Sequence, residues 1–291
     1  MVSIPSNVTD RISTLQALTQ LFRLPVGILA ALAGCATIYV INAATPLLDY
    51  VLTAITLVCM MSAACAINDY WDIDKDRIDH PERPLPSGRL SLSQAWWVAV
   101  ILFGCALIAA IPLGLYLFIL VFSCVLLLWN YSHLLLYSGI LGNLIVATII
   151  AALILMGSAV ADRPLAMLYP TGFLFCYALA KEIIWDIHDA AGDRSQGIVT
   201  IANQWGDRTA FVTAWSLLGL VLLSIPMAVY CLPMAHPWLF TLCSLALLLS
   251  LGTALIQYQQ RRDDIAYKQL VFWERISMVC GILSLLAIAP S

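Results

Sequence analysis

Charged residues are scarce in this sequence. Only 11% of the 291 residues are Asp, Glu, Lys or Arg, whereas 62% are hydrophobic, and the mean hydropathy is +0.92. An ordinary globular domain is about half apolar and about a quarter charged. A water-soluble fold cannot bury so large an apolar fraction, and the composition therefore indicates an integral membrane protein.

Three further features are missing, and each excludes a class of protein. The nine cysteines have neither paired nor ligand-like spacing, which argues against structural disulfides and zinc sites. The net charge is −3 and there is no basic domain, which excludes nucleic acid as a partner. No low-complexity tract or long linker divides the chain, and we therefore expect residues 1–291 to form a single domain.

Apolar segments recur along the whole chain, and most are close to the ~20 residues that a helix needs to cross a bilayer. They are continuously apolar, whereas the strands of a membrane barrel alternate between apolar and polar residues. We therefore predict an all-α polytopic bundle of nine transmembrane helices, with a central cavity that opens on the cytoplasmic side. The predicted helices are Leu24–Val40, Leu47–Ile67, Ala95–Ile111, Leu115–Tyr131, Ile140–Val160, Met167–Ile184, Ala210–Cys231, Trp238–Ile256 and Leu270–Ala289.

The basic residues predict the orientation, because Lys and Arg concentrate in cytoplasmic loops. With the N-terminus in the cytoplasm, only Arg163 of the 14 basic residues falls on the outer side. Nine spans then place the C-terminus outside.

A dense acidic patch follows the second predicted span. If the helix continues, Asn68, Asp72 and Asp76 recur at i, i+4 and i+8 and share one face. The prolines and glycine of residues 80–88 then predict a structured loop. Ser91 and Gln94 offer a capping box for the next helix.

A second acidic patch follows the sixth predicted span, on the same side of the membrane. Glu182, Asp186, Asp189 and Asp193 lie at i, i+4, i+7 and i+11, which again defines one helical face. Like charges on one face repel, and a carboxylate at membrane depth costs about 2.5–3.5 kcal/mol. These patches therefore need cations.

Mg²⁺ prefers oxygen ligands, and it is typically held by one or two carboxylates that share it with substrate phosphates. Two opposed acidic faces at the mouth of a bundle would hold such ions, which could ionise a diphosphate ester by stabilising its leaving oxygens. The apolar bundle would hold the hydrocarbon and shield a carbocation from water. The implied substrate is a prenyl diphosphate. Arg77, Arg83, Lys181 and Arg194 are candidates for contacts with diphosphate oxygens, although each also suits a topology anchor.

The motifs resemble those of the UbiA superfamily of intramembrane prenyltransferases. Residues 68–76 match N-D-x-x-D-x-x-x-D, and residues 189–193 match D-x-x-x-D. Residues 83–91 look like R-P-[IL]-P-S-G-x-[IL]-S. Residues 181–189 are similar to the R-E-I-x-K-D-I-E-D of the geranylgeranylglyceryl-phosphate prenyltransferase branch. Tyr131-Ser132 and the Gly142–Ala147 segment extend the similarity.

The resemblance implies a role for each matching residue. Asn68, Asp72 and Asp76 would bind one Mg²⁺, and Asp189 and Asp193 the other. It assigns Asp69 and Asp186 to the support of the metal ligands or of the acceptor, and it places the Tyr131 ring opposite the allylic carbon, where it could stabilise a cation.

Two departures from the family pattern bear on the acceptor. Leu136 stands where relatives commonly have Lys, and residues 23–27 lack an Asn that often follows an Arg-Pro pair. Transfer of the prenyl group to an aromatic or polar-lipid acceptor is our leading prediction, and a membrane terpene cyclase that uses the same metals is the alternative. An ion-coupled transporter fits less well, because its acidic residues would lie near the middle of the spans.

Overall fold

A computed structural model describes residues 6–133 and 138–288, and these ranges form helices connected by short loops, without strands. The long helices are α1 (Ser6–Leu21), α2 (Leu24–Ile41), α3 (Leu47–Trp71), α5 (Leu92–Ala110), α6 (Leu115–Trp129), α8 (Gly139–Val160), α9 (Leu168–His188), α12 (Asp207–Cys231), α13 (Pro237–Arg261) and α14 (Asp264–Leu286). The short helices are α4 (Ile73–Asp79), η1 (Ile111–Leu113), α10 (Ala190–Ser195) and α11 (Ile201–Trp205).

Each of the nine predicted spans overlaps one of the described helices, and the predicted all-α polytopic fold is confirmed. Ala289, the predicted end of the last span, lies outside the described residues. The count of nine spans is not reproduced in full. Seven described helices are long and apolar enough to cross a membrane, and α6 and α9 are not among them. α6 has only 15 residues, and Lys181 and Glu182 lower the hydropathy of α9.

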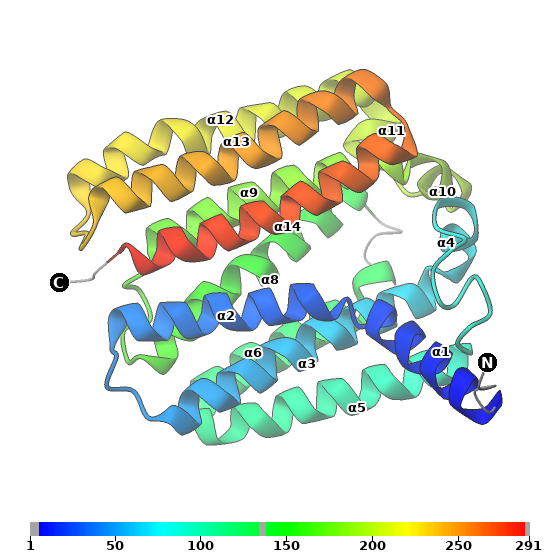
Figure 1. The fold of residues 1–291 in the computed structure, drawn as a ribbon, viewed down its shortest axis with the longest axis horizontal. Helices are drawn as coiled ribbons and strands as arrows, with labels where there is room; N and C mark the ends of the chain where they lie inside the picture. Colours follow the sequence, from blue (N-terminus) through cyan, green and yellow to red (C-terminus); the bar gives the residue numbers. More distant parts are fainter. Residues whose placement is uncertain (1–5, 134–137, 289–291) are drawn as a thin grey trace, which may run out of the picture.

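The helices form two packed halves around a central space. Figure 1 shows α3, α5 and α6 on one side and α9, α12, α13 and α14 on the other. α8 packs against both α2 and α9, and α14 packs against α2, so that contacts close the bundle into a ring. Each half has its own apolar core.

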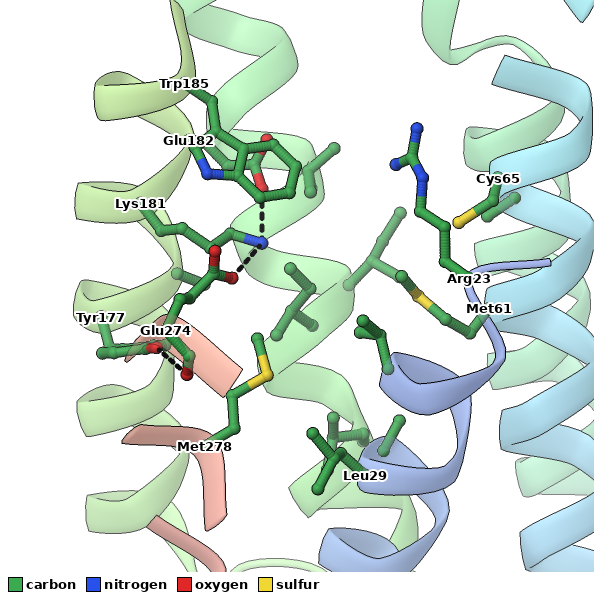
Figure 2. A pocket seen from close by; sticks show the side chains of 18 of the residues that line it. Arg23, Leu29, Met61, Cys65, Tyr177, Lys181, Glu182, Trp185, Glu274 and Met278 are labelled. Carbon is green, nitrogen blue, oxygen red and sulfur yellow. Dashed lines mark hydrogen bonds and ion pairs between the residues drawn. The ribbon is translucent and has the colours of Figure 1, made fainter. Parts of the chain in front are cut away.

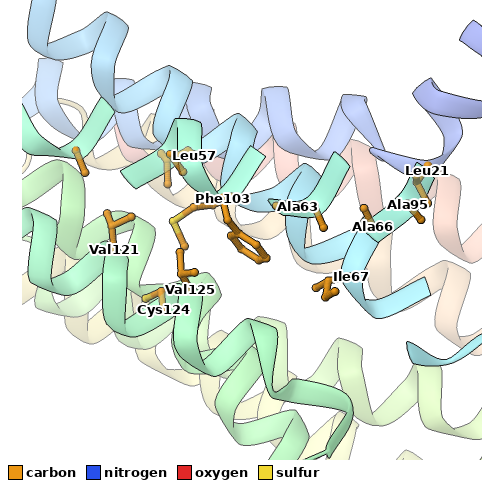
Figure 3. Close-up of a cluster of buried hydrophobic side chains, with 14 of the residues drawn as sticks. Leu21, Leu57, Ala63, Ala66, Ile67, Ala95, Phe103, Val121, Cys124 and Val125 are labelled. Carbon is orange, nitrogen blue, oxygen red and sulfur yellow. The ribbon is translucent and has the colours of Figure 1, made fainter. Parts of the chain in front are cut away.

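Small residues bring helices of the first half close together. Ala63, Ala66 and Ala95 are fully buried where α3 meets α5, and Phe103 fills the neighbouring space (Figure 3). Close approach matters here because lipid is as apolar as the side chains themselves, and helix association in a bilayer depends on van der Waals packing.

Both acidic segments lie at one end of the bundle, beside α1, and the described C-terminal part lies at the other end (Figure 1). A single residue interrupts each helix there. Asp72 separates α3 from α4 with ψ 16°, and Asp189 separates α9 from α10 with ψ 9°. The hydrogen bonds of the helix nevertheless continue, since the Asp76 N–H donates to Asp72 O at 2.8 Å and the Asp193 N–H to Asp189 O at 3.0 Å. The predicted faces therefore persist.

The segment after α4 is irregular, as its prolines predict. Gly88 has φ 74°, a left-handed conformation that glycine adopts without steric cost. The predicted capping box is present at the start of α5, where the Ser91 side chain accepts from the Gln94 N–H and the Gln94 side chain accepts from the Ser91 N–H.

The contact between α2 and α8 gives a test of the packing. A Cβ atom at Gly157 would lie 2.8 Å from the Gly34 carbonyl oxygen and 2.8 Å from Thr37 Cβ, so Gly157→Ala must push the two helices apart. We expect a loss of about 1–3 kcal/mol of stability, measured as a lower Tm in detergent. Gly104→Ala in α5 is the control, because no atom lies within 4 Å of its added Cβ, and it is expected to leave Tm unchanged or higher. Equal Tm values for the two variants would contradict the close approach.

Candidate active site

A cavity of about 1140 Å³ lies between the two halves of the bundle. Its walls inside the bundle are apolar, with side chains such as Leu29, Met61 and Met278 (Figure 2). Its other end is bounded by the acidic segments and by residues 80–83. A hydrocarbon chain and a charged headgroup can therefore occupy the same space.

The first acidic segment contributes Asn68, Asp72 and Asp76 to the cavity lining, as predicted. Asp76 is only 2% exposed, and its Oδ1 accepts a hydrogen bond from Arg83 at 2.6 Å. Asp69 is buried beside the cavity, where its Oδ1 lies 3.0 Å from Arg23 and 3.7 Å from Arg83. Asp69 thus holds two cations in place.

The second acidic segment is joined to the first by an ammonium group. Lys75 Nζ lies 2.6 Å from Asp193 Oδ1 and 3.9 Å from Asp189 Oδ2. The Gly192 N–H donates to both carboxylate oxygens of Asp79, at 3.0 and 3.1 Å. Side chains from both segments therefore meet, although Asp193, unlike Asp189, does not line the cavity.

Within the described part of the chain, two carboxylate oxygens in this region lack a hydrogen-bond partner. Asp76 Oδ2 and Asp193 Oδ2 are buried and have no hydrogen-bond partner among the described residues. A buried charged oxygen without a partner is costly. One such oxygen on each acidic segment, with Asn68 and Asp72 nearby, suits hard cations such as Mg²⁺.

The environments of these carboxyl groups differ. Burial raises the pKa of Asp72 to about 6. Burial also raises the pKa of Asp76, against the opposing charge of Arg83. For Asp189 burial is outweighed by hydrogen bonds from His188 and His80 and by the charge of Lys75, and its pKa falls below the ordinary value. Asp189 therefore stays ionised where Asp72 takes up a proton.

Asp186 and Tyr131 line the same cavity. The Asp186 Oδ2 atom accepts a hydrogen bond from the Asn143 side chain at 2.7 Å, which fixes the carboxylate. The structure thus places both residues with the predicted metal ligands.

Further inside, Lys181 lies between two carboxylates. Its Nζ is 3.0 Å from Glu182 and 3.7 Å from Glu274, and it sits 4.5 Å from the Trp185 ring centre (Figure 2). Lys181 lines the cavity, but the two carboxylates already neutralise the charge that was predicted to contact diphosphate oxygens.

Arg77 and Arg194 are placed differently from the other predicted contacts. Arg77 is 63% exposed and pairs with Asp74 one helical turn away, and Arg194 donates to Asn203 on the surface. Neither lines the cavity. Sequence spacing identified the basic residues of these segments but not the direction in which each one points.

Four further residues belong to this site that the sequence motifs do not indicate: Lys75, Arg23, His80 and His188. Lys75 lies one helical turn after Asp72, so its position within the acidic patch could have indicated that it belongs to the site. Arg23 reaches Asp69 across 46 residues of sequence, and no local pattern indicates that contact.

The described residues form an all-helical membrane bundle with two acidic segments at the mouth of an apolar cavity, which has room for a ligand with a charged head and an apolar tail. Residues 24–276 match the model of the UbiA prenyltransferase family, and the chain belongs to this family.

The chain is similar to a digeranylgeranylglyceryl phosphate synthase of Sulfolobus acidocaldarius, with 34% identity over 184 residues. The aligned part covers 63% of this chain and 66% of that relative, just under two thirds of its length.

Solved structures share the fold. A UbiA homolog from Aeropyrum pernix K1 superposes with a TM-score of 0.72 at 20% identity, covering 90% of this chain and 96% of the other. A UbiA homolog from Archaeoglobus fulgidus, solved bound to GPP and Mg²⁺, gives a TM-score of 0.69 at 15% identity, covering 92% and 99%.

The raised pKa of Asp72 can be measured by infrared spectroscopy. We expect a protonated carboxyl band that disappears with a midpoint near pH 6 and that is absent in Asp72→Asn. Because the carboxylate is the cation-binding form, the cation affinity of the site should fall as the pH drops below about 6. Asp74→Asn, at a side chain that is 69% exposed, should keep the band. A component that titrates near pH 6 and survives in Asp72→Asn would contradict the assignment.

Proposed function

We propose that this protein transfers a prenyl group from a prenyl diphosphate to a polar-lipid acceptor that carries a glycerol phosphate, and that it requires Mg²⁺. The observation that carries the proposal is the pair of buried, unpartnered carboxylate oxygens Asp76 Oδ2 and Asp193 Oδ2. Asp76 lines the charged end of the apolar cavity, and Asp193 lies against Lys75, which lines the same end. The name of the Sulfolobus relative supports the acceptor class, and the GPP and Mg²⁺ in the Archaeoglobus homolog support the donor and the metal.

Asn68, Asp72 and Asp76 would hold one Mg²⁺, and Asp189 and Asp193 the other, since all are oxygen donors. When bound, Mg²⁺ polarises the diphosphate and offsets the charge that develops on its leaving oxygen. Lys75 and Arg83, which now neutralise Asp193 and Asp76, lie where they can contact phosphate oxygens.

In the reaction, the bond between prenyl C1 and the diphosphate oxygen breaks, and a bond forms between C1 and the acceptor oxygen. The apolar cavity walls exclude water from the carbocation. The Tyr131 ring stabilises positive charge on C1 through a cation–π contact. Asp186, which Asn143 holds in position, takes the proton from the acceptor hydroxyl group.

Two further cations suit the acceptor phosphate. Lys268 and Arg275 are both exposed on α14 and both line the cavity. Neither forms an ion pair within the part of the chain described here. They therefore remain available for a second anionic group, separate from the diphosphate held at the acidic segments.

We place the acidic end of the bundle on the cytoplasmic side, with the N-terminus in the cytoplasm and the C-terminus outside. The excess of basic residues in the loops at this end supports that orientation. The position of α1 beside the acidic segments, opposite the end of α14, agrees with it.

Asp72→Asn and Asp189→Asn test the metal assignment. We expect each to lower the turnover of radiolabelled prenyl diphosphate by at least about 100-fold, because each removes a charge that supports the developing diphosphate. Asp74→Asn is the matched control in the same acidic stretch, since Asp74 points to solvent and pairs with Arg77. The assignment fails if folded Asp72→Asn and Asp189→Asn proteins turn over substrate at the wild-type rate.

The same assay without an acceptor separates the two reactions of this class. A prenyltransferase should leave the prenyl diphosphate largely unconsumed. Cyclic hydrocarbons or alcohols, detected by mass spectrometry, would instead establish a terpene cyclase and end the transferase proposal.

Lys268→Ala and Arg275→Ala test the acceptor contact. Each should raise KM for a glyceryl phosphate lipid by about tenfold or more, as expected for a charged hydrogen bond worth about 1.5–3 kcal/mol, while KM for the prenyl diphosphate changes little. Lys268→Arg keeps the charge and should restore much of the affinity. If both KM values rise together, these residues do not distinguish the acceptor.

A further inference from the structure

We infer that His80, His188 and Asp189 form a binding site for a transition-metal ion such as Zn²⁺, separate from the proposed Mg²⁺ sites but sharing Asp189 with one of them. His80 ends α4, His188 is the last residue of α9, and Asp189 follows it. The site rests on the proposed function only through the shared carboxylate. An ion bound there takes Asp189 from Mg²⁺ and thereby inhibits prenyl transfer.

The three side chains already converge on one point. His80 Nε2 lies 3.1 Å and His188 Nδ1 lies 2.9 Å from the same atom, Asp189 Oδ1. The three ligand atoms are all within 4.8 Å of one another. Tetrahedral zinc with bonds of about 2.0–2.1 Å places its ligand atoms roughly 3.3 Å apart. Small side-chain rotations are therefore enough to admit the ion.

The donor atoms determine which ion is preferred. Imidazole nitrogens suit zinc, copper and nickel, whereas Mg²⁺ takes oxygen ligands. Two nitrogens and one carboxylate oxygen therefore select against Mg²⁺. In the branch motif that residues 181–189 resemble, position 188 is Glu, so the second nitrogen is a feature of this chain.

The surroundings hold both rings in place. His80 Nδ1, the nitrogen that faces away from Asp189, lies 3.7 Å from Glu82 Oε1, and a carboxylate beside the outer nitrogen is typical of metal-binding histidines. The His188 ring stacks on Tyr267, with ring centres 3.5 Å apart and planes 16° apart. The His80 ring is nearly parallel to that of His188, at 18°.

The site is accessible and incomplete. All three residues line the cavity, which gives an ion a route in. Three protein ligands leave at least one coordination position for water or for a phosphate oxygen. Lys75 approaches Asp189 through the other carboxylate oxygen, Oδ2, at 3.9 Å, so the ammonium group does not occupy the oxygen that the two histidines share.

Co²⁺ is a suitable probe, because its visible absorption is much stronger in a tetrahedral site than in an octahedral one. Full-length protein in detergent, without Mg²⁺, prenyl diphosphate or acceptor, should bind one Co²⁺ with a tetrahedral absorption band that stoichiometric Zn²⁺ removes. His80→Asn and His188→Gln should each weaken Co²⁺ binding by at least about tenfold, since loss of even a hydrogen-bond partner of a ligand costs about 10–100-fold. His236→Asn, between α12 and α13, is the matched control and should bind as the wild type does.

X-ray absorption of the Zn²⁺-loaded wild-type protein adds a test that needs no variant, and it should show two imidazoles at the metal. An all-oxygen shell, or Co²⁺ affinity unchanged in both histidine variants, would overturn the inference. These measurements use no substrate, so their outcome does not depend on the proposed function. A protein that binds Co²⁺ through His80 and His188 but transfers no prenyl group would refute the proposed function and leave the metal site supported.

Discussion

Carboxylates from two distant parts of the chain meet where little water can reach them, and their repulsion must be offset for the bundle to close. Lys75, Arg83 and Arg23 provide the offsetting charge, each against an aspartate that is almost fully buried or lines the cavity. Isolated buried charges are costly, and removing one member of a buried pair is strongly destabilising. The two halves of the bundle are thus joined by ion pairs at one end and by apolar packing along the rest.

The local backbone also allows the two acidic segments to approach each other closely. α4 and α10 touch because residue 192 is glycine, and a Cβ atom there would lie 2.6 Å from Lys75 Cγ and against the Asp79 carboxylate. The single-residue interruptions at Asp72 and Asp189 let each short helix lean away from its parent while the hydrogen bonds of the helix continue. Asp72 and Asp76 therefore both line the cavity although α3 has ended, and Asp189 lines it at the end of α9.

The apolar segments, both acidic faces and the capping box at Ser91 could be predicted from the sequence, because each depends on local periodicity or spacing. The pairing of Lys75 with Asp193 could not, since it depends on how two segments more than 100 residues apart pack. Arg77 and Arg194 show that sequence spacing also indicates residues that do not reach the site. They occupy the right stretches of sequence, but their side chains point to solvent, and spacing alone does not fix that direction.

Lys75 and Arg83 act as internal counter-ions, and this has a thermodynamic consequence. Any divalent ion that takes over Asp193 or Asp76 releases the ammonium or guanidinium group bound there, which is then free to meet an anion. Under the proposed function, metal and diphosphate would therefore strengthen each other's binding, and by linkage the gain would be the same in both directions. A chain that carries its own cations in this way can keep a metal-dependent site folded and closed to stray anions until both ligands arrive together.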